Sequence, residues 1–300
     1  MTPGPCLKEL GMKVESSGWS ARNFIALVMV LCGLQAVAQS RGGPGVFDTE
    51  DQENLRVPVG TVLPVRLNHG FSAKSARAGQ VIRGRVMQDV PLPNGRRIPE
   101  GAKVAGMILS VSPSGNNSGN KISFRFDRLE IHHRRIPIVT SLRALASFME
   151  VGYAQVPEAP TGFGTPYNWA TTDQIGGDVK YGVGGPVTDH WSRTIGQGVF
   201  DGVLVHVRAQ PGSHCRGAMD DEDRLQALWV FSSDACGVFG MAGVKILHAG
   251  RTEPEGEIVL ASERGDLKVQ AGSGMLSIKF SSRWGRAGPS RRIPGEKLVP

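Results

Sequence analysis

The sequence predicts an all-β protein, in which a small, glycine-punctuated antiparallel β-barrel or sandwich is followed by a second β-rich antiparallel region. The chain of 300 residues holds 40 Gly and 19 Pro, a density of helix breakers that argues against a long helical bundle. Apolar and polar residues alternate over several short stretches, most clearly in residues 121–131. Turn signals separate these stretches, and Asn94-Gly95 is the strongest hairpin signal among them.

The first 38 residues have the three zones of a secretory signal peptide. Basic residues precede an apolar run at residues 24–34, and the small residues Ala36 and Ala38 follow it. A charged zone, an apolar core and an A-x-A site make up a cleavable signal. The run of 11 residues is shorter than the about 20 that a membrane-spanning helix needs. We therefore expect cleavage before Gln39 and export to the periplasm, the outer envelope or the extracellular space.

Positive charge is concentrated near the C-terminus. Residues 281–300 supply +4 of the net charge of +7, from five Lys and Arg against one Glu. This Gly-, Pro- and Ser-containing tail is predicted to be disordered, and either solvated or in contact with an anionic surface such as lipid headgroups or an acidic polymer. Residues 39–280 are nearly balanced in charge, so we expect no specific nucleic-acid partner.

A polar linker at residues 39–54 leads into the first β unit, which is expected at residues 55–149. Residues 57–67 read as a strand in which Pro64 should lie at an edge or a bulge, because Pro cannot donate to a sheet ladder. The alternation in residues 121–131 slips by one residue at Asp127-Arg128, which predicts a bulge. Residues 141–149 are expected to form a short helix.

Two further regions follow this unit. Residues 150–201 are rich in Gly and Pro without a sustained period, and we expect a long loop region there. Residues 202–280 return to strand-like patterns at short spacing, which predicts an antiparallel β region arranged as a meander. Residues 281–300 are the basic tail.

The block at residues 57–142 resembles the C-terminal β-barrel domain of TrbI-type conjugal transfer proteins, the outer-ring component of type IV secretion channels. The resemblance lies in residues 59–67, in Ala78-Gly79-Gln80, in the segment Ile98-Pro99-Glu100-Gly101 continuing to Gly106, and in residues 124–129. It implies a small barrel in the cell envelope, in which Gly101 lets the chain reverse and Gly106 relieves crowding. Members of that family carry an inner-membrane helix and a proline-rich stretch before the barrel, where this chain has a cleavable signal. The resemblance therefore implies fold and compartment rather than a role in DNA transfer.

Two of the four cysteines remain after cleavage of the signal. Cys6 and Cys32 lie within the signal, and Cys215 and Cys236 lie in the last β region. In an oxidising compartment these two form one bridge, which closes a short loop and stabilises the fold by about 3 kcal/mol. His214 adjoins Cys215, but one His and two Cys do not make a zinc set, so no metal or cofactor is expected.

One group of aromatic residues is a candidate ligand surface. The group could stack on sugar rings, or it could anchor the loop region to the sheet; its members are Tyr167, Trp169, Tyr181, His190 and Trp191. The other clusters have plainer readings. The acidic run at residues 220–223 reads as a solvated turn, and Gly272-Ser273-Gly274 as a hairpin turn rather than a nucleophile elbow. His132-His133 should point to opposite faces of a strand and so not chelate one metal ion.

The sequence thus favours an exported, non-catalytic cell-envelope or secreted β-protein that acts as a scaffold or a binding module, with an envelope polysaccharide or a protein as partner. One alternative is an extracellular carbohydrate-active hydrolase with its site in residues 150–215. It requires two carboxylates about 5 to 10 Å apart, and the candidates are Asp173, Asp178, Asp189 and Asp201. The other alternative is a subunit of a secretion or conjugation channel. No residue is assigned a catalytic role.

Overall fold

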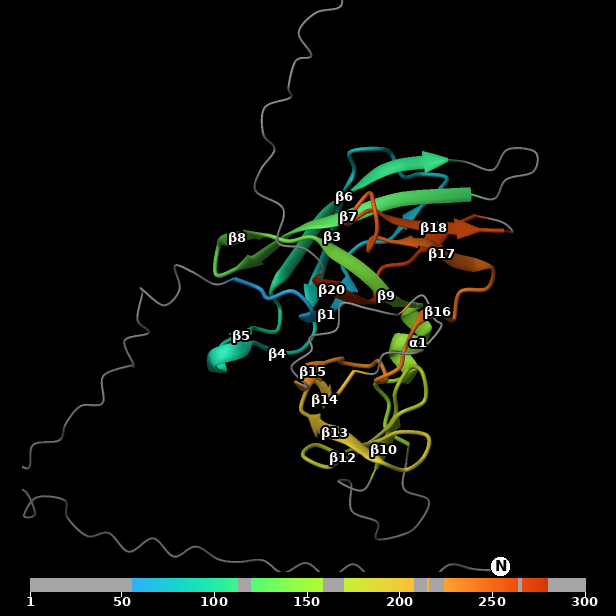
Figure 1. The fold of residues 1–300 in the computed structure, drawn as a ribbon. Coiled ribbons are helices and arrows are strands. Elements are labelled where there is room, and N and C mark those ends of the chain that lie inside the picture. Colours follow the sequence, from blue (N-terminus) through green and yellow to red (C-terminus); the bar gives the residue numbers. More distant parts are fainter. Residues whose placement is uncertain are drawn as a thin grey trace, which may run out of the picture. The chain divides into compact units, whose positions relative to one another are not determined.

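Strands form nearly all the regular structure in the computed structural model, which describes residues 56–112, 120–158, 170–207, 215, 224–263 and 266–279 (Figure 1). These residues belong to the unit that spans Asn54–Pro300. The α-helix among them is α1 (Phe148–Tyr153), and Ser147 caps it by accepting a hydrogen bond from the Glu150 N–H. The prediction of an all-β fold is confirmed. None of the helical segments in the described ranges has the length and apolarity that a membrane span requires.

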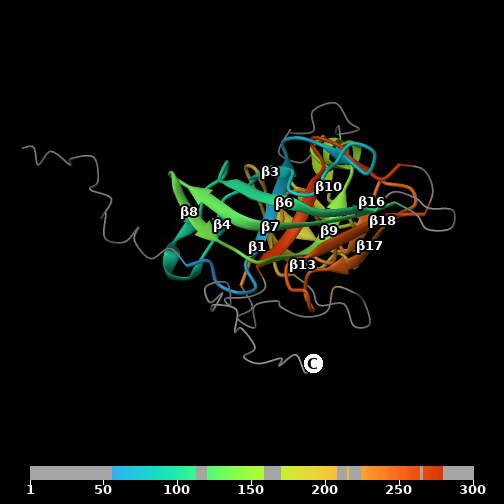
Figure 2. The same ribbon diagram turned by 90° about the horizontal axis from the view of Figure 1, so that it is seen from above.

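The larger of the two main sheets has ten strands, nearly all antiparallel (Figures 1 and 2). Nine lie in the hydrogen-bonded order β16 (Gly237–Phe239), β9 (Thr140–Ala146), β20 (Gly274–Lys279), β1 (Val62–Leu67), β3 (Val81–Val86), β6 (Lys103–Ser112), β7 (Asn120–Ile131), β18 (Ile258–Ser262) and β17 (Val244–Ala249), and β8 (Arg134–Pro137) pairs with β7. Among the strand pairs that the structure describes in this sheet, only β16–β9 is parallel. No pairing in the described ranges joins β16 to β17 and closes this order into a barrel.

The expected C-terminal meander is wrong. β17 and β18 do pair with each other, but β18 also pairs with β7, and β20 lies between β1 and β9. Three strands after residue 243, β17, β18 and β20, therefore complete the sheet that begins at β1. Alternation within a strand shows which residues face the core, but it does not show which strand is the neighbour.

A second sheet has six strands in chain order, each antiparallel to the next. They are β10 (Thr171–Asp173), β11 (Val179–Tyr181), β12 (Pro186–Thr188), β13 (Thr194–Val199), β14 (Gly202–Val205) and β15 (Gln226–Ala227). Residues 171–199 therefore hold four strands of a sheet, where a loop region was expected. These strands are too short for a visible period, and some of the Gly residues lie inside them. A Cβ on Gly196 would lie 2.1 Å from the Leu204 carbonyl oxygen.

Two hydrophobic cores meet at β1. Leu63, Val65 and Leu67 point into the core enclosed by the large sheet, together with Phe124 and Phe126. On the opposite face, Val62 packs in a second core between the two sheets, whose other members include Ala144, Ala146, Leu276, Phe231, Val203 and Val205. The second sheet thus covers only one end of the outer face of β1, and Arg66 near the other end is exposed.

Several local predictions are confirmed. Ala105 pairs with Arg128 and Gly106 pairs with Phe126, so Asp127 is the extra residue of a bulge in β7. A Cβ on Gly106 would lie 1.8 Å from the Arg125 carbonyl oxygen, which explains why Gly occupies this strand position. The Asn94-Gly95 signal marks a hairpin of β4 (Val90–Pro91) and β5 (Arg97–Ile98), joined by the 3-10 helix η1 (Pro93–Gly95).

Other local predictions need correction. Pro64 does not lie at an edge, because its strand β1 is paired on both sides. The β1–β3 ladder begins only at Val65, so the N–H that Pro64 lacks breaks no bond of that ladder. Residues 141–146 continue β9 as a fully buried strand, and the expected helix begins only at Phe148. The last short pair of strands is β2 (Phe71–Ser72) with β19 (Lys268–Val269).

Candidate ligand pocket

A pocket of about 620 Å³ lies beside the second sheet. Its apolar wall includes Met87, Val183, Phe200 and Trp229, and its polar lining includes Glu100, Gln155, Gln174, Lys180 and Asp201. Ligand pockets of proteins are typically hollows of this size, with mainly apolar walls and a few polar groups that fix orientation. This pocket is therefore the strongest candidate for a binding site in the part of the chain that the structure describes.

The turn between β13 and β14 brings an aromatic ring and a carboxylate to the pocket. Val199 pairs with Gly202, so Phe200 and Asp201 form a two-residue hairpin turn. Phe200 has 83% of its surface exposed. Position 202, which follows the turn, requires Gly, because a Cβ there would lie 2.6 Å from the Cα of Trp229. The turn therefore holds an exposed aromatic ring next to an acid at the rim of the pocket.

Trp229 forms a rigid part of the pocket wall. Its backbone has φ of 55°, a left-handed value that a bulky residue rarely adopts. The backbone N–H of Trp229 donates to Oε1 of Gln88 over 2.8 Å, and Nε2 of Gln88 donates to the Val203 carbonyl over 2.8 Å. Trp229 is only 4% exposed. The buried Gln88 amide thus ties Trp229 to β14, and the surrounding structure holds an unfavourable backbone conformation, as is often found at ligand sites.

The polar groups of the pocket influence one another electrostatically. Although Glu100 is exposed, its pKa is raised above the usual value, first by partial desolvation and then by the charge of Asp201 and a side-chain hydrogen bond with it. Asp89 raises that pKa further, and its Oδ1 accepts the Glu100 N–H over 2.8 Å. Burial lowers the pKa of Lys180, whereas Asp201 opposes that shift. Lys180 also donates from Nζ to the Val199 carbonyl over 3.4 Å.

The candidate acids of the hydrolase alternative lie in different surroundings. Asp201 lines the pocket together with Glu100, and its charge raises the pKa of Glu100. Two candidate acids have structural contacts instead. Asp178 is buried and accepts the Ser233 N–H, and Asp189 is buried and accepts the N–H groups of Trp191 and Arg193. The remaining candidate, Asp173, is exposed on β10.

The three described members of the predicted aromatic surface lie at two places on the second sheet. Tyr181 lies at the end of β11, next to the β11–β12 turn, whereas His190 and Trp191 lie in the β12–β13 turn at the other end of that ladder. Trp191 is 60% exposed, and its ring lies against the His190 ring at a tilt of 40°. The Arg193 guanidinium carbon lies 4.5 Å from the centroid of the Trp191 ring. Tyr167 and Trp169 lie outside the described residues, as does the acidic run at 220–223.

His132 and His133 form the turn between β7 and β8, where Ile131 pairs with Arg134. Both have positive φ, of 45° and 69°. Two successive positive φ values characterise the tight type I′ hairpin turn. The pair thus occupies a turn, not the end of a strand as expected.

Ser273 lies in a turn before β20 and is fully buried, but the strands on either side, β19 and β20, pair with other strands and not with each other. That turn is therefore not a hairpin.

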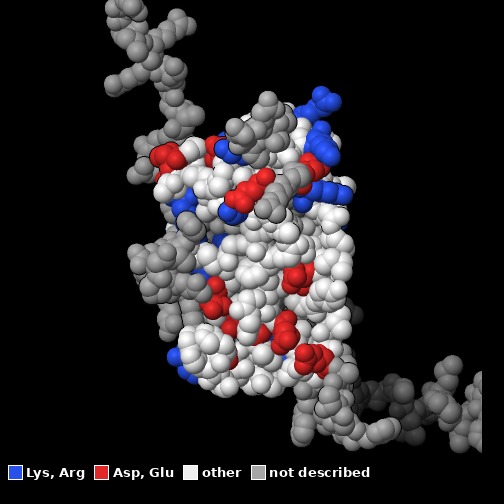
Figure 3. All heavy atoms as spheres, turned by 90° about the vertical axis from the view of Figure 1, so that its right-hand side faces the viewer, with Lys and Arg blue, Asp and Glu red and all other residues white. Residues whose placement is uncertain are grey.

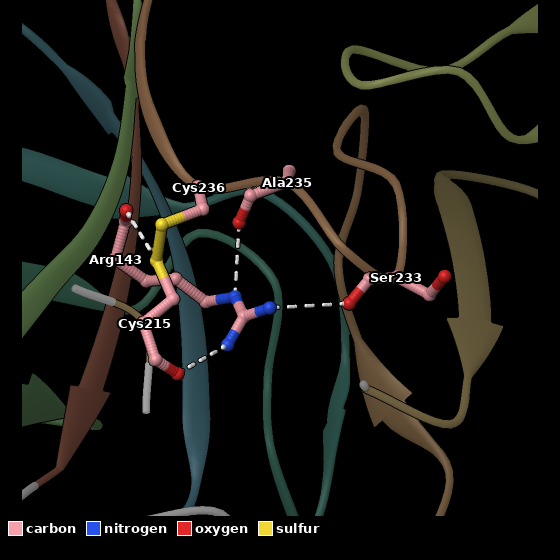
Figure 4. Close-up of a disulfide and its surroundings, with 5 residues drawn as sticks. All are labelled: Arg143, Cys215, Ser233, Ala235 and Cys236. Atoms are coloured by element: carbon pink, nitrogen blue, oxygen red, sulfur yellow. Dashed lines mark hydrogen bonds between the residues drawn. A yellow bond between two sulfur atoms is a disulfide. The ribbon is translucent and has the colours of Figure 1, made fainter. Parts of the chain in front are cut away.

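The predicted disulfide is confirmed. Cys215 and Cys236 are bonded, with Cα atoms 6.0 Å apart (Figure 4). Arg143 from β9 lies beside the bridge and is only 1% exposed. Its Nε donates to the Ala235 carbonyl over 2.9 Å, Nη1 to the Cys215 carbonyl over 3.4 Å, and Nη2 to the Ser233 carbonyl over 3.4 Å. No sequence pattern singled out this arginine, which ties the disulfide region to the large sheet.

Surface charge is mixed on the face seen in Figure 3. Acidic side chains predominate in its lower part, where the second sheet lies, and Lys and Arg gather mainly toward its upper right edge. This agrees with the near balance of charge in residues 39–280. Within the described ranges, no group of three or more His, Cys, Asp and Glu side chains could hold a metal ion.

Comparisons with protein-family models, with curated proteins and with solved structures find no match to this chain. Its function must therefore be argued from its own residues. The pocket residues Glu100, Lys180, Phe200 and Trp229 were not predicted as a site, because they come from separate strands and turns. The sequence offered one usable signal, which is Phe200-Asp201 between two strand-like stretches.

Proposed function

We propose that this protein is an exported, non-catalytic binding module of the cell envelope or the extracellular space, and that the pocket at Phe200 and Asp201 binds sugar units of a polysaccharide. The exposed Phe200 ring, which lines one pocket together with the carboxyl groups of Asp201 and Glu100, is the observation that carries the proposal. An aromatic face offers a flat apolar surface to a sugar ring, and carboxyl oxygens accept hydrogen bonds from its hydroxyls.

Two features support the exported location. A disulfide persists in oxidising compartments and is rare in the cytosol, and Cys215 and Cys236 are bonded. The signal-like segment before Gln39 provides the route of export. The resemblance of residues 57–142 to TrbI-type barrel domains is part of the same proposal, because it suggests the envelope as the compartment. Mass spectrometry of protein from the periplasm or medium should give an N-terminus at Gln39, and retention of residues 1–38 would contradict this part.

A glycan array tests the proposed ligand class. The wild-type chain should bind a set of neutral oligosaccharides, and Phe200→Ala should reduce that binding. Trp191→Ala is the matched control, because it removes another exposed aromatic ring from a turn of the same sheet. Equal binding by the wild type and Phe200→Ala, or a loss seen only with Trp191→Ala, would show that this pocket is not the site.

A further inference from the structure

Three cations lie in one row across neighbouring strands of the large sheet. Arg66 in β1 is directly opposite Arg85 in β3, and Arg85 is directly opposite Lys103 in β6. All three side chains are exposed, and Arg83, two residues before Arg85, faces the same side. Figures 1 and 2 show the three strands side by side. We call Arg66, Arg85 and Lys103 the basic row.

The basic row has no acidic partner in the described ranges, where none of its members takes part in an ion pair. Glu130 in β7 lies opposite Lys103, but its carboxylate is within 4 Å of the Arg128 and Arg135 guanidinium groups instead. Like charges directly opposite one another on a sheet are destabilising. A row of three such positions is therefore explained best by an external anion.

The row adjoins a hollow of about 690 Å³ that is lined by Arg66, Arg85, Asn68 and His69, among others. Met87 and Glu100 line both this hollow and the pocket at Phe200. The cationic hollow and the proposed sugar pocket are therefore neighbours on the surface.

We propose that the basic row binds the carboxylates of a linear acidic polysaccharide. Neighbouring strands lie about 4.8 Å apart, so the row presents cations at regular short steps, which a polymer with one carboxylate on each sugar can meet in turn. Glu130 ends the row at β7, and Glu100 also lines the hollow. This narrow strip suits a single extended chain better than a broad anionic surface. The choice of a polysaccharide over other polyanions rests on the proposed function of the adjoining pocket.

Two triple variants of the exported chain test the proposal by titration with polygalacturonate and alginate at low salt. Arg66→Gln, Arg85→Gln and Lys103→Gln together remove the row. Lys74→Gln, Arg77→Gln and Lys121→Gln together remove the same charge from other exposed positions. Both variants keep the basic tail at residues 281–300, so its contribution cancels. The row variant should lose about tenfold or more in affinity, the control less than about twofold, and wild-type binding should weaken as salt rises.

Several outcomes would overturn the proposal. They are an absence of wild-type binding to both polymers, an equal loss in the two triple variants, and tighter row-dependent binding of duplex DNA or of vesicles with phosphatidylglycerol. Phe200→Ala separates the two proposals: if it leaves binding of neutral sugars unchanged while the row variant loses polygalacturonate, the pocket proposal fails and anion binding by the row stands.

Discussion

Arg143 in β9 and Cys215 in the disulfide make two contacts with each other. Nη1 of Arg143 donates to the Cys215 carbonyl over 3.4 Å, and the Cys215 sulfur lies 3.6 Å from the Arg143 carbonyl oxygen (Figure 4). The pKa of Arg143 is lowered to about 10, first by burial and then by the charge of Arg251, and the charge of Asp234 opposes the shift. The side chain is therefore still charged at neutral pH, and its charge is met by backbone carbonyls around the bridge.

Arg143→Met should destabilise the fold by about 2–4 kcal/mol, because it leaves buried carbonyls without their donors. Denaturant unfolding followed by circular dichroism measures the change. Arg135→Met is the control, since that side chain is 73% exposed and its ion pair with Glu130 contributes at most about 1 kcal/mol. Equal stability of the two variants would show that the carbonyl contacts of Arg143 contribute little.

Removal of the disulfide by Cys215→Ser with Cys236→Ser should cost about 3 kcal/mol, the chain-entropy estimate for a sequence separation of 21. The loss should not add fully to that of Arg143→Met, because one of the carbonyls that Arg143 contacts belongs to Cys215. A double-mutant cycle in urea measures this coupling. Strict additivity would mean that Arg143 and the bridge act independently.

Gly106→Ala should destabilise the protein by about 1–3 kcal/mol, because the added Cβ would lie 1.8 Å from the Arg125 carbonyl oxygen. Gly152→Ala is the control. It lies in α1 with nothing within 4 Å of the added Cβ, so it should stabilise by up to about 1 kcal/mol. Thermal unfolding of the two variants measures the difference in sign, and a neutral Gly106→Ala would show that the β6–β7 ladder can relax around the bulge at Asp127.

The side chain of Glu100 should titrate above its usual pKa of 4.5, and Asp201→Asn should bring the pKa back toward that value by removing the like charge. Carbon-detected NMR of the Glu100 carboxyl measures both midpoints. Because the pKa of Glu100 is higher in the folded state than in the unfolded state, folding is favoured when this carboxyl is protonated. This contribution to the free energy of unfolding is complete below the unfolded-state pKa, and it is lost as pH rises through the folded-state pKa. Because Glu100 is exposed, we expect this effect on stability to be small.

Local features of the fold could be predicted because they depend on neighbouring residues. The phase slip at Asp127, the hairpin signal at Asn94-Gly95 and the pairing of the last two cysteines each follow from a short pattern or a simple count. The position of β20 between β1 and β9 could not be predicted, because it depends on the docking of strands from opposite ends of the chain. The short strands of the second sheet also escaped prediction, since three residues do not show a period.

The candidate site was the least predictable part. Glu100 follows the β4–β5 hairpin and Asp201 lies in the β13–β14 turn, and only the contact between the second sheet and the large sheet brings them together. The exposed aromatic residue that matters in our account is Phe200, whereas the sequence directed attention to Tyr181 and Trp191. A single Phe-Asp pair in a turn is too common to single out without the pocket beside it.

The central claim is that the pocket at Phe200 binds sugar, and NMR mapping of the backbone amides tests it most directly. Titration of the labelled chain with neutral cello-, chito- and malto-oligosaccharides should shift the amide signals of Phe200, Asp201, Gly202 and Trp229 in a saturable manner for at least one series. Absence of any saturable shift, or shifts confined to His190 and Trp191 in the β12–β13 turn, would contradict the account.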